Sequence, residues 1–257
     1  MAGRAGFSWR WPDRRKKTAM TDIHTLRRDL AAAFVLADRF GLSEGICNHF
    51  SAVVPGDAER YLINPFGLHW SEMTPDSLLV IDGEGRVVEG DGTVETTARF
   101  IHIAGHRANA RHKALMHTHM PHATALTMLQ GGHLAMAHQT AARFHDRMAH
   151  HPFGGLALDD SEGSRIAEAQ RANPDADILF LDNHGVTVGG ESVAVAFDDL
   201  YYLERACRQQ ILAQSTGLPL KLIEGQVLQE TRRQSEQVRV PLSEGHFAAL
   251  LRVHGLA

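Results

Sequence analysis

The sequence predicts an α/β protein with a central, largely antiparallel sheet covered by helices on both faces. Two observations predict it. Short apolar strands separated by turn residues cluster between residues 46 and 88, which is typical of antiparallel neighbours. Beyond residue 95, amphipathic helical patterns alternate with buried strands at 115–119 and 178–181. Strands clustered early and then mixed with helices indicate helical layers packed against a sheet.

The first half of the chain begins with a helix and continues into the strand cluster. Apolar residues recur at intervals of three and four from Ile23 to Phe40, with Thr21 as the expected N-cap and Gly41 as the stop. A loop that enters a strand is predicted at 45–54, and strands are predicted at 61–64, 78–81 and 86–88. The last two flank Asp82-Gly83-Glu84-Gly85, whose residues favour a tight turn, so they are expected to form a hairpin.

The second half alternates helices with strands. Strands are predicted at 115–119, 178–181 and 186–188. Residues 133–158 are rich in histidine and are expected to be irregular. Helices are predicted at 95–109, from Pro121 to near Gly131, at 161–172, from Ser192 to Gly217, at 221–233 and, beyond Pro241, from Ser243 onward.

Composition is that of an ordinary globular protein. The chain has 257 residues, 44% hydrophobic and 22% charged, and residues 21–257 are expected to form one domain. A formal net charge of −4 provides no overall basic field, so nucleic acid is not an expected partner. No apolar run is long enough to span a bilayer, so no membrane association is expected.

Two further features bear on location. Cys47 and Cys207 are too few for a disulfide framework and fit a reducing cytoplasm. Both lie in segments expected to be buried, and neither is assigned a catalytic role. Residues 1–20 carry arginines and lysines around two tryptophans, without a signal peptide's apolar segment, and are expected to be a disordered basic arm.

A pair of histidines on one strand is the main functional signal. Residues two apart on a strand face the same side, so His117 and His119 are expected to point into one site. His184 follows the strand at 178–181, at a glycine turn. Three imidazoles on strand ends would form an open metal site whose remaining positions take water or substrate. Because the chain has 17 histidines, spacing alone leaves a chance arrangement equally open.

Six segments in a fixed order extend this signal. They are residues 48–51 (NHFS), 62–68 (LINPFGL), 99–102 (RFIH), 114–119 (ALMHTH), 183–186 (NHGV) and 202–207 (YLERAC). Together they resemble the class II aldolase/adducin head family. The resemblance implies a three-layer α/β/α sandwich, a cyclic homotetramer with active sites near subunit interfaces, and a divalent metal on His117, His119 and His184, with zinc expected first and manganese or iron as alternatives.

The chain departs from the sugar-phosphate aldolases of that family at two places. An ungapped count back from His102 puts Ala98 where those enzymes carry a catalytic glutamate, and Glu95 lies one helical turn earlier. Phe66-Gly67 and Thr96-Thr97 stand at the two phosphate-binding places, so an aromatic ring replaces one hydroxyl donor. We therefore expect these four residues to contact a non-phosphorylated substrate.

The expected activity is metal-dependent carbon–carbon lysis, either aldol cleavage or decarboxylation. A divalent ion with open positions would hold a small hydroxy or keto acid, or an aromatic carboxylic acid, and stabilise the negative charge that develops when the carbon–carbon bond breaks. Two alternatives stay open. A three-histidine site also suits a non-haem iron oxygenase, and adducin-type heads are interaction modules without catalysis.

Candidates for the remaining roles are ranked by position. Asn48 matches an asparagine that contacts substrate in the aldolases, and His122 and His145 are candidate acid/base groups. His49 and His102 are candidates for orienting the ligands. Gln139 and Arg147 fall in the irregular segment, where substrate-selecting residues often lie. Glu204 and Arg205 are expected to serve packing.

Overall fold

The computed structural model describes residues 22–156 and 160–257. In this part of the chain, eight strands form one sheet in the order β4-β3-β2-β1-β5-β8-β7-β6. Every neighbouring pair is antiparallel except β6 with β7, which confirms the prediction of a largely antiparallel sheet. The strands are β1 (His49–Val53), β2 (Arg60–Ile63), β3 (Leu79–Asp82), β4 (Val87–Glu89), β5 (Ala114–Thr118), β6 (Met148–His151), β7 (Ile178–Leu181) and β8 (Gly185–Gly190).

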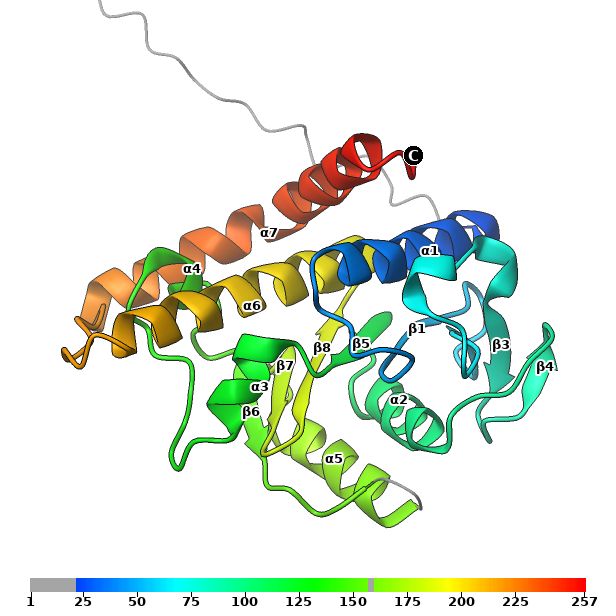
Figure 1. Ribbon diagram of the computed structural model, residues 1–257, viewed down its shortest axis with the longest axis horizontal. Coiled ribbons are helices and arrows are strands. Elements are labelled where there is room, and N and C mark those ends of the chain that lie inside the picture. The colour runs from blue at the N-terminus through cyan, green and yellow to red at the C-terminus, as the bar shows by residue number, and fades with distance from the viewer. Residues whose placement is uncertain (1–21, 157–159) are drawn as a thin grey trace, which may run out of the picture.

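Helices lie on both faces of this sheet, which confirms the α/β/α sandwich (Figure 1). They are α1 (Ile23–Arg39), α2 (Thr96–Ala108), α3 (Pro121–Thr127), α4 (Gln139–Ala142), α5 (Asp160–Ala172), α6 (Val193–Gln214) and α7 (Gly225–Val253). α1 and α6 cover one face, with α3 and α4 packed against α6, while α2 and α5 pack together on the other face. α7 lies on α6, outside these layers.

The alternation of side chains along β1 separates the core from the polar face. Phe50 and Ala52 belong to the large apolar core under α1 and α6. His49 and Ser51 point the opposite way and hydrogen-bond with His102 of α2. Since neighbouring residues of a strand face opposite sides, one strand supplies both the core and the polar residues of the α2 side.

Two helix starts show the local chemistry that defines them. Asp22 caps α1 by accepting a hydrogen bond from the Thr25 amide, so the cap is one residue later than predicted, and Thr21 lies outside the described residues. Ser192 caps α6 as predicted, accepting from the Val195 amide. The expected basic arm at residues 1–20 also lies outside the described residues.

The prediction that residues 133–158 are irregular is wrong. They contain the short helix α4 and the edge strand β6, which pairs in parallel with β7. The sequence of β6, Met148-Ala149-His150-His151, lacks the apolar alternation that marks a strand. An edge strand with one pairing neighbour can carry histidines on both sides, so its pairing is decided by β7 rather than by its own pattern.

The prediction of two C-terminal helices separated by Pro241 is also wrong. One helix, α7, runs from Gly225 to Val253 with Pro241 inside it. Proline removes one backbone donor from a helix, and that loss is offset by packing, because Phe247 and Leu251 are buried in the main core. None of the described helices is long and apolar enough to cross a membrane.

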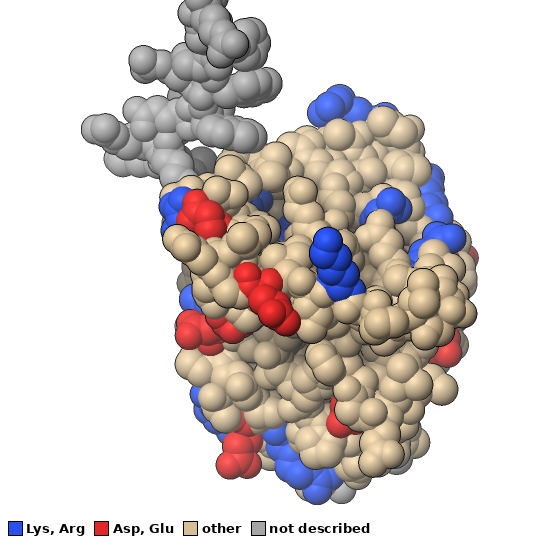
Figure 2. All heavy atoms as spheres, turned by 90° about the vertical axis from the view of Figure 1, so that its left-hand side faces the viewer, with Lys and Arg blue, Asp and Glu red and all other residues tan. Residues whose placement is uncertain are grey.

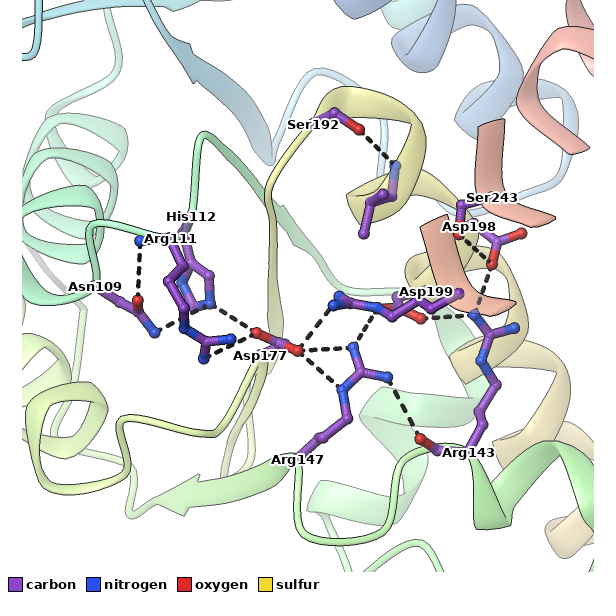
Figure 3. Close-up of polar contacts among 12 residues, drawn as sticks. Asn109, Arg111, His112, Arg143, Arg147, Asp177, Ser192, Asp198, Asp199 and Ser243 are labelled. Carbon is purple, nitrogen blue, oxygen red and sulfur yellow. Dashed lines mark hydrogen bonds and ion pairs between the residues drawn. The ribbon is translucent and has the colours of Figure 1, made fainter. Parts of the chain in front are cut away.

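A buried charge cluster holds α7 against the rest of the fold (Figure 3). Asp199 of α6 is fully buried and accepts hydrogen bonds from Arg143, Arg147 and Arg239. Asp177 lies within ion-pair distance of Arg147 and Arg239, at 2.8 and 3.3 Å. Arg147 therefore belongs to the interior, and the prediction that it selects substrate in an irregular loop is wrong.

Removing the α7 arginine is expected to destabilise the protein. Arg239→Ala leaves two buried carboxylates short of a partner, which should lower the free energy of unfolding by about 3 kcal/mol, measured by urea denaturation. Arg233→Ala is the control on the same helix, because its ion pair with Glu230 is exposed. Equal midpoints for the two variants would show that the cluster does not hold α7.

Candidate metal centre

Three histidines from two places in the chain converge at one end of the sheet. His117 lies in β5, His119 directly follows it, and His184 lies in the turn between β7 and β8. One nitrogen from each ring lies within 4.8 Å of the other two. Their ring centroids are 4.8 to 5.1 Å apart. The structure thus brings together the three residues that the sequence predicts as ligands.

The β7–β8 turn is built to let these rings approach. Asn183 has a φ of 55°, a left-handed conformation that asparagine tolerates better than most residues. At Gly185, a Cβ atom would lie 2.5 Å from the Thr118 carbonyl oxygen and 2.8 Å from Cδ2 of His119. Only glycine avoids this clash. His184 therefore supplies a candidate ligand, and Gly185 leaves the space that the His119 ring occupies.

Hydrogen bonds define which nitrogens of the strand histidines face the site. His117 donates Nδ1–H to the Val186 carbonyl at 3.0 Å, and His119 donates Nδ1–H to the Glu44 carboxylate. In both rings this leaves Nε2 as the nitrogen with a lone pair. Nε2 of His119 is buried and has no hydrogen-bond partner among the described residues. A buried ring nitrogen with a lone pair and no partner can coordinate a divalent ion.

Burial keeps these rings in the form that binds a metal. It lowers the pKa of His117 well below its usual value. Burial and the nearby His119 lower the pKa of His184 to about 4. Metal binding requires the neutral imidazole, so both rings are ready to bind near neutral pH without losing a proton.

A second group of polar side chains lies beside the three histidines. Asn48, at a φ of 75°, accepts a hydrogen bond from the His119 amide through Oδ1, while its Nδ2 is buried without a partner among the described residues. Asn48, Phe66 and Glu95 line a small pocket together with Ile46, His49, Asn64 and Ala98. Asn48 and Phe66 therefore share one pocket, and Gly67 follows Phe66 with a φ of 89°.

Glu95 lies next to the three histidines, which it reaches through His49. Its carboxylate lies 2.8 Å from Nε2 of His49, and the His49 ring stacks on His117 with centroids 5.2 Å apart. The hydrogen bond from His49 lowers the pKa of Glu95 below its usual value. Thr97 lies 3.4 Å from the same His49 nitrogen, whereas Thr96 is exposed at the first turn of α2.

Comparison with known proteins identifies the family of this chain. The family model for the Class II Aldolase and Adducin N-terminal domain matches residues 28–211. The chain belongs to this family. The match begins in α1 and ends in α6, so it includes all three histidines and leaves α7 outside. Class II aldolases typically use a divalent metal, which agrees with the three-histidine geometry.

Proteins similar to this class II aldolase/adducin chain include an aldolase II superfamily protein and an adducin. A crystal structure of an aldolase II superfamily protein from Pseudomonas syringae has 34% identity and a TM-score of 0.83, covering 93% of this chain and 94% of that one. Alpha-adducin of Rattus norvegicus is 33% identical over 77% of this chain, but only 27% of the adducin is covered. An L-fuculose 1-phosphate aldolase from Glaciozyma antarctica PI12 has 24% identity and a TM-score of 0.80, covering 90% of both chains, and shows the fold alone.

The other predicted residues of this aldolase/adducin chain lie elsewhere or have other partners. His122 hydrogen-bonds with Glu204, which also accepts from the amides of His122 and Ala123 at the start of α3. This agrees with a packing role for Glu204. His145 hydrogen-bonds with Gln229 of α7. Neither histidine is part of the three-imidazole group found among the described residues.

The two cysteines differ in their exposure to solvent. Cys207 is buried as expected, but Cys47 is exposed, so the prediction for Cys47 is wrong. It lies in a loop before β1 whose apolar neighbour Ile46 is 41% exposed. Gln139 lines a cavity of about 840 Å³ between α4, α6 and α7.

Proposed function

We propose that the protein is a divalent-metal-dependent carbon–carbon lyase, an aldolase or a decarboxylase. The observation that carries the proposal is the convergence of three imidazoles, one of them with a buried Nε2 that has no hydrogen-bond partner in residues 22–156 and 160–257. Zinc is the first choice of metal, because neutral imidazole is one of its ordinary ligands and the ion has no redox chemistry, and manganese is the second choice.

Each neighbouring residue would have a defined task. His117, His119 and His184 hold the ion, which when bound polarises a substrate oxygen and stabilises its negative charge. Asn48 donates a hydrogen bond to that substrate through Nδ2, which has no partner in the part of the chain that the structure describes. Glu95 would exchange a proton with the reacting carbon, because its carboxylate hydrogen-bonds with His49, whose ring stacks on His117.

The substrate proposed is a small, non-phosphorylated hydroxy or keto acid, or an aromatic carboxylic acid. Phe66 is 52% exposed at the pocket and offers a ring face rather than a hydroxyl donor. Thr96 and Thr97 are the hydroxyls left at the start of α2, and Thr97 already contacts His49. A doubly charged phosphate would therefore find few free donors here.

We also propose that the protein works as a cytoplasmic homotetramer without nucleic acid or membrane partners. Leucines 212, 218 and 222 are exposed at the end of α6 and in the segment leading to α7. Figure 2 shows that most of this end of the molecule is uncharged. The native mass should then be about four times the 28.3 kDa of one chain, measured by light scattering.

Metal analysis and substrate assays test the proposal. Protein purified without added metal should contain about one zinc or manganese ion per chain. It should cleave or decarboxylate members of the proposed acid class, lose the activity with a chelator, and regain it with metal. Bound iron together with oxygen consumption would favour the oxygenase instead. A protein that contains no metal and takes up none would favour an adducin-type interaction module.

A further inference from the structure

His119 is held differently from the other histidine of its strand. Nδ1 of His117 faces the Val186 carbonyl oxygen, a backbone atom whose place is fixed by the pairing of β5 with β8. His119 lies one residue beyond β5, and its Nδ1 hydrogen-bonds with a side chain instead, the Glu44 carboxylate. That carboxylate is 75 positions away in the sequence and belongs to the loop between α1 and β1. The direction of the His119 ring therefore depends on this loop.

The loop between α1 and β1, residues 40–48, contacts His119 at two places. A tight turn forms in it, because the Cys47 amide donates to the Glu44 carbonyl oxygen at 3.0 Å. On one side of this turn the Glu44 carboxylate accepts from the His119 ring. On the other side Oδ1 of Asn48 accepts from the His119 backbone amide at 3.3 Å. The same short loop therefore fixes both the backbone and the ring of one candidate ligand.

Glu44 makes no other side-chain contact of this kind among the described residues. Its side chain is 62% exposed, and His119 is its one ion-pair partner in that part of the chain. It is not placed as a ligand itself, since the three-imidazole group found there contains no carboxylate. The two ring nitrogens are distinct, so the carboxylate holds Nδ1 while the buried Nε2 keeps its lone pair for an ion. Glu44 can therefore act on a metal only through His119.

A carboxylate in this position changes how well the imidazole binds a metal. It fixes the tautomer that leaves the lone pair on Nε2, it orients the ring, and its negative charge makes the ring a more basic ligand. Losing such an outer partner typically weakens metal binding by about 10- to 100-fold. Because Glu44 is largely in contact with solvent, its charge is partly screened. Removing the charge alone should therefore have an effect at the lower end of that range.

We propose that Glu44 is a positioning residue of the metal centre, which orients His119 through its Nδ1–H group and so strengthens the binding of a divalent ion. The proposal rests on the metal-dependent function proposed above and extends it to a residue outside the ligand set. The turn gives the contact its geometry, and the carboxylate supplies its charge. Neither requires a substrate, so zinc affinity measures the effect without any enzymatic activity.

Zinc titration against a competing chelator tests the proposal. Glu44→Gln keeps an acceptor oxygen but loses the charge, so it should bind zinc about tenfold more weakly than the wild type. Glu44→Ala loses both and should bind zinc about 100-fold more weakly. Glu59→Ala is the matched control, because the Glu59 side chain is 61% exposed and pairs with Arg107 of α2. Equal zinc affinity of Glu44→Ala and the wild type, or an equal loss in Glu59→Ala, would overturn the proposal.

Urea denaturation of the metal-free proteins separates positioning from a structural role. Glu44→Ala should unfold at the same urea midpoint as the wild type, because an exposed side chain leaves no cavity and no buried charge. A midpoint lowered as far as that of Arg239→Ala would show that Glu44 supports the fold, and would overturn the proposal.

The zinc titration also distinguishes this inference from the lyase function. A wild-type protein that binds zinc more tightly than Glu44→Ala, but acts on none of the proposed acids, would contradict the lyase function and support the role of Glu44. An active zinc lyase whose Glu44→Ala variant binds zinc as tightly as the wild type would contradict this inference alone.

Discussion

His117→Ala is expected to abolish metal retention and lyase activity while leaving the sheet folded. His117 is the most buried of the three candidate ligands, and its Nδ1–H bond to Val186 fixes the ring so that Nε2 faces the site. Removing an outer partner of a ligand costs about 10- to 100-fold in metal affinity, so losing the ligand itself should cost more than about 100-fold. Metal content by mass spectrometry and the circular dichroism spectrum check the two halves of this expectation.

His112→Ala is the matched control for that experiment. His112 is 1% exposed and His117 is 2% exposed, but His112 hydrogen-bonds with Asp177 in the charge cluster. Both variants leave a cavity of similar size, and His112→Ala also removes a partner of the buried Asp177, so it should lose at least as much stability as His117→Ala. Only His117→Ala should lose the metal. A His117→Ala protein that retains the wild-type ratio of metal would contradict the assignment of the three histidines.

Glu95→Gln is expected to lower kcat by about 10²- to 10⁴-fold while metal content stays at the wild-type ratio. The amide keeps the size of the side chain and can donate to Nε2 of His49, but it cannot hold or release a proton. Glu95 makes no side-chain hydrogen bond as the N-cap of α2, so the helix should start as before. Steady-state kinetics and metal analysis on the same preparation measure both quantities.

The control for Glu95→Gln is Glu59→Gln. The Glu59 carboxylate forms an exposed ion pair with Arg107 of α2, the helix that begins after Glu95. The kinetics of Glu59→Gln should match those of the wild type. The three-imidazole group found among the described residues does not include Glu95. If Glu95→Gln lost its metal, Glu95 would be a ligand, and the ungapped count that places Ala98 at the ligand position would be wrong.

Local patterns were sufficient for much of the fold and for the three histidines. The His-x-His spacing predicts that His117 and His119 face one side, because the alternation of side chains along a strand is a local property. The His-Gly pair after residues 178–181 predicts a turn at the end of that strand. The hairpin at residues 82–85 and the Ser192 cap are equally local. The pairing of His49 opposite His117 in neighbouring strands is not, since register depends on the assembled sheet.

The features missed from sequence all depend on distant partners. β6 is a strand because β7 pairs with it, and α7 continues through Pro241 because the core and Asp199 hold it. Counting residues back from His102 assigns a position to each residue but gives no side-chain contacts. It therefore could not show that the side chain of Glu95 reaches His49. Arg147 resembled a loop residue because its carboxylate partners are 30 and 52 positions away.

The arginine that α7 inserts next to Asp199 also determines where the chain can be shortened. The shared family segment ends at residue 211, inside α6, and does not include α7. A protein cut at that point would keep Asp177 and Asp199 in the interior with one cation fewer, and would uncover the apolar surface that Phe247 and Leu251 protect. The segment that the family model matches is therefore not, for this protein, an independently stable fragment.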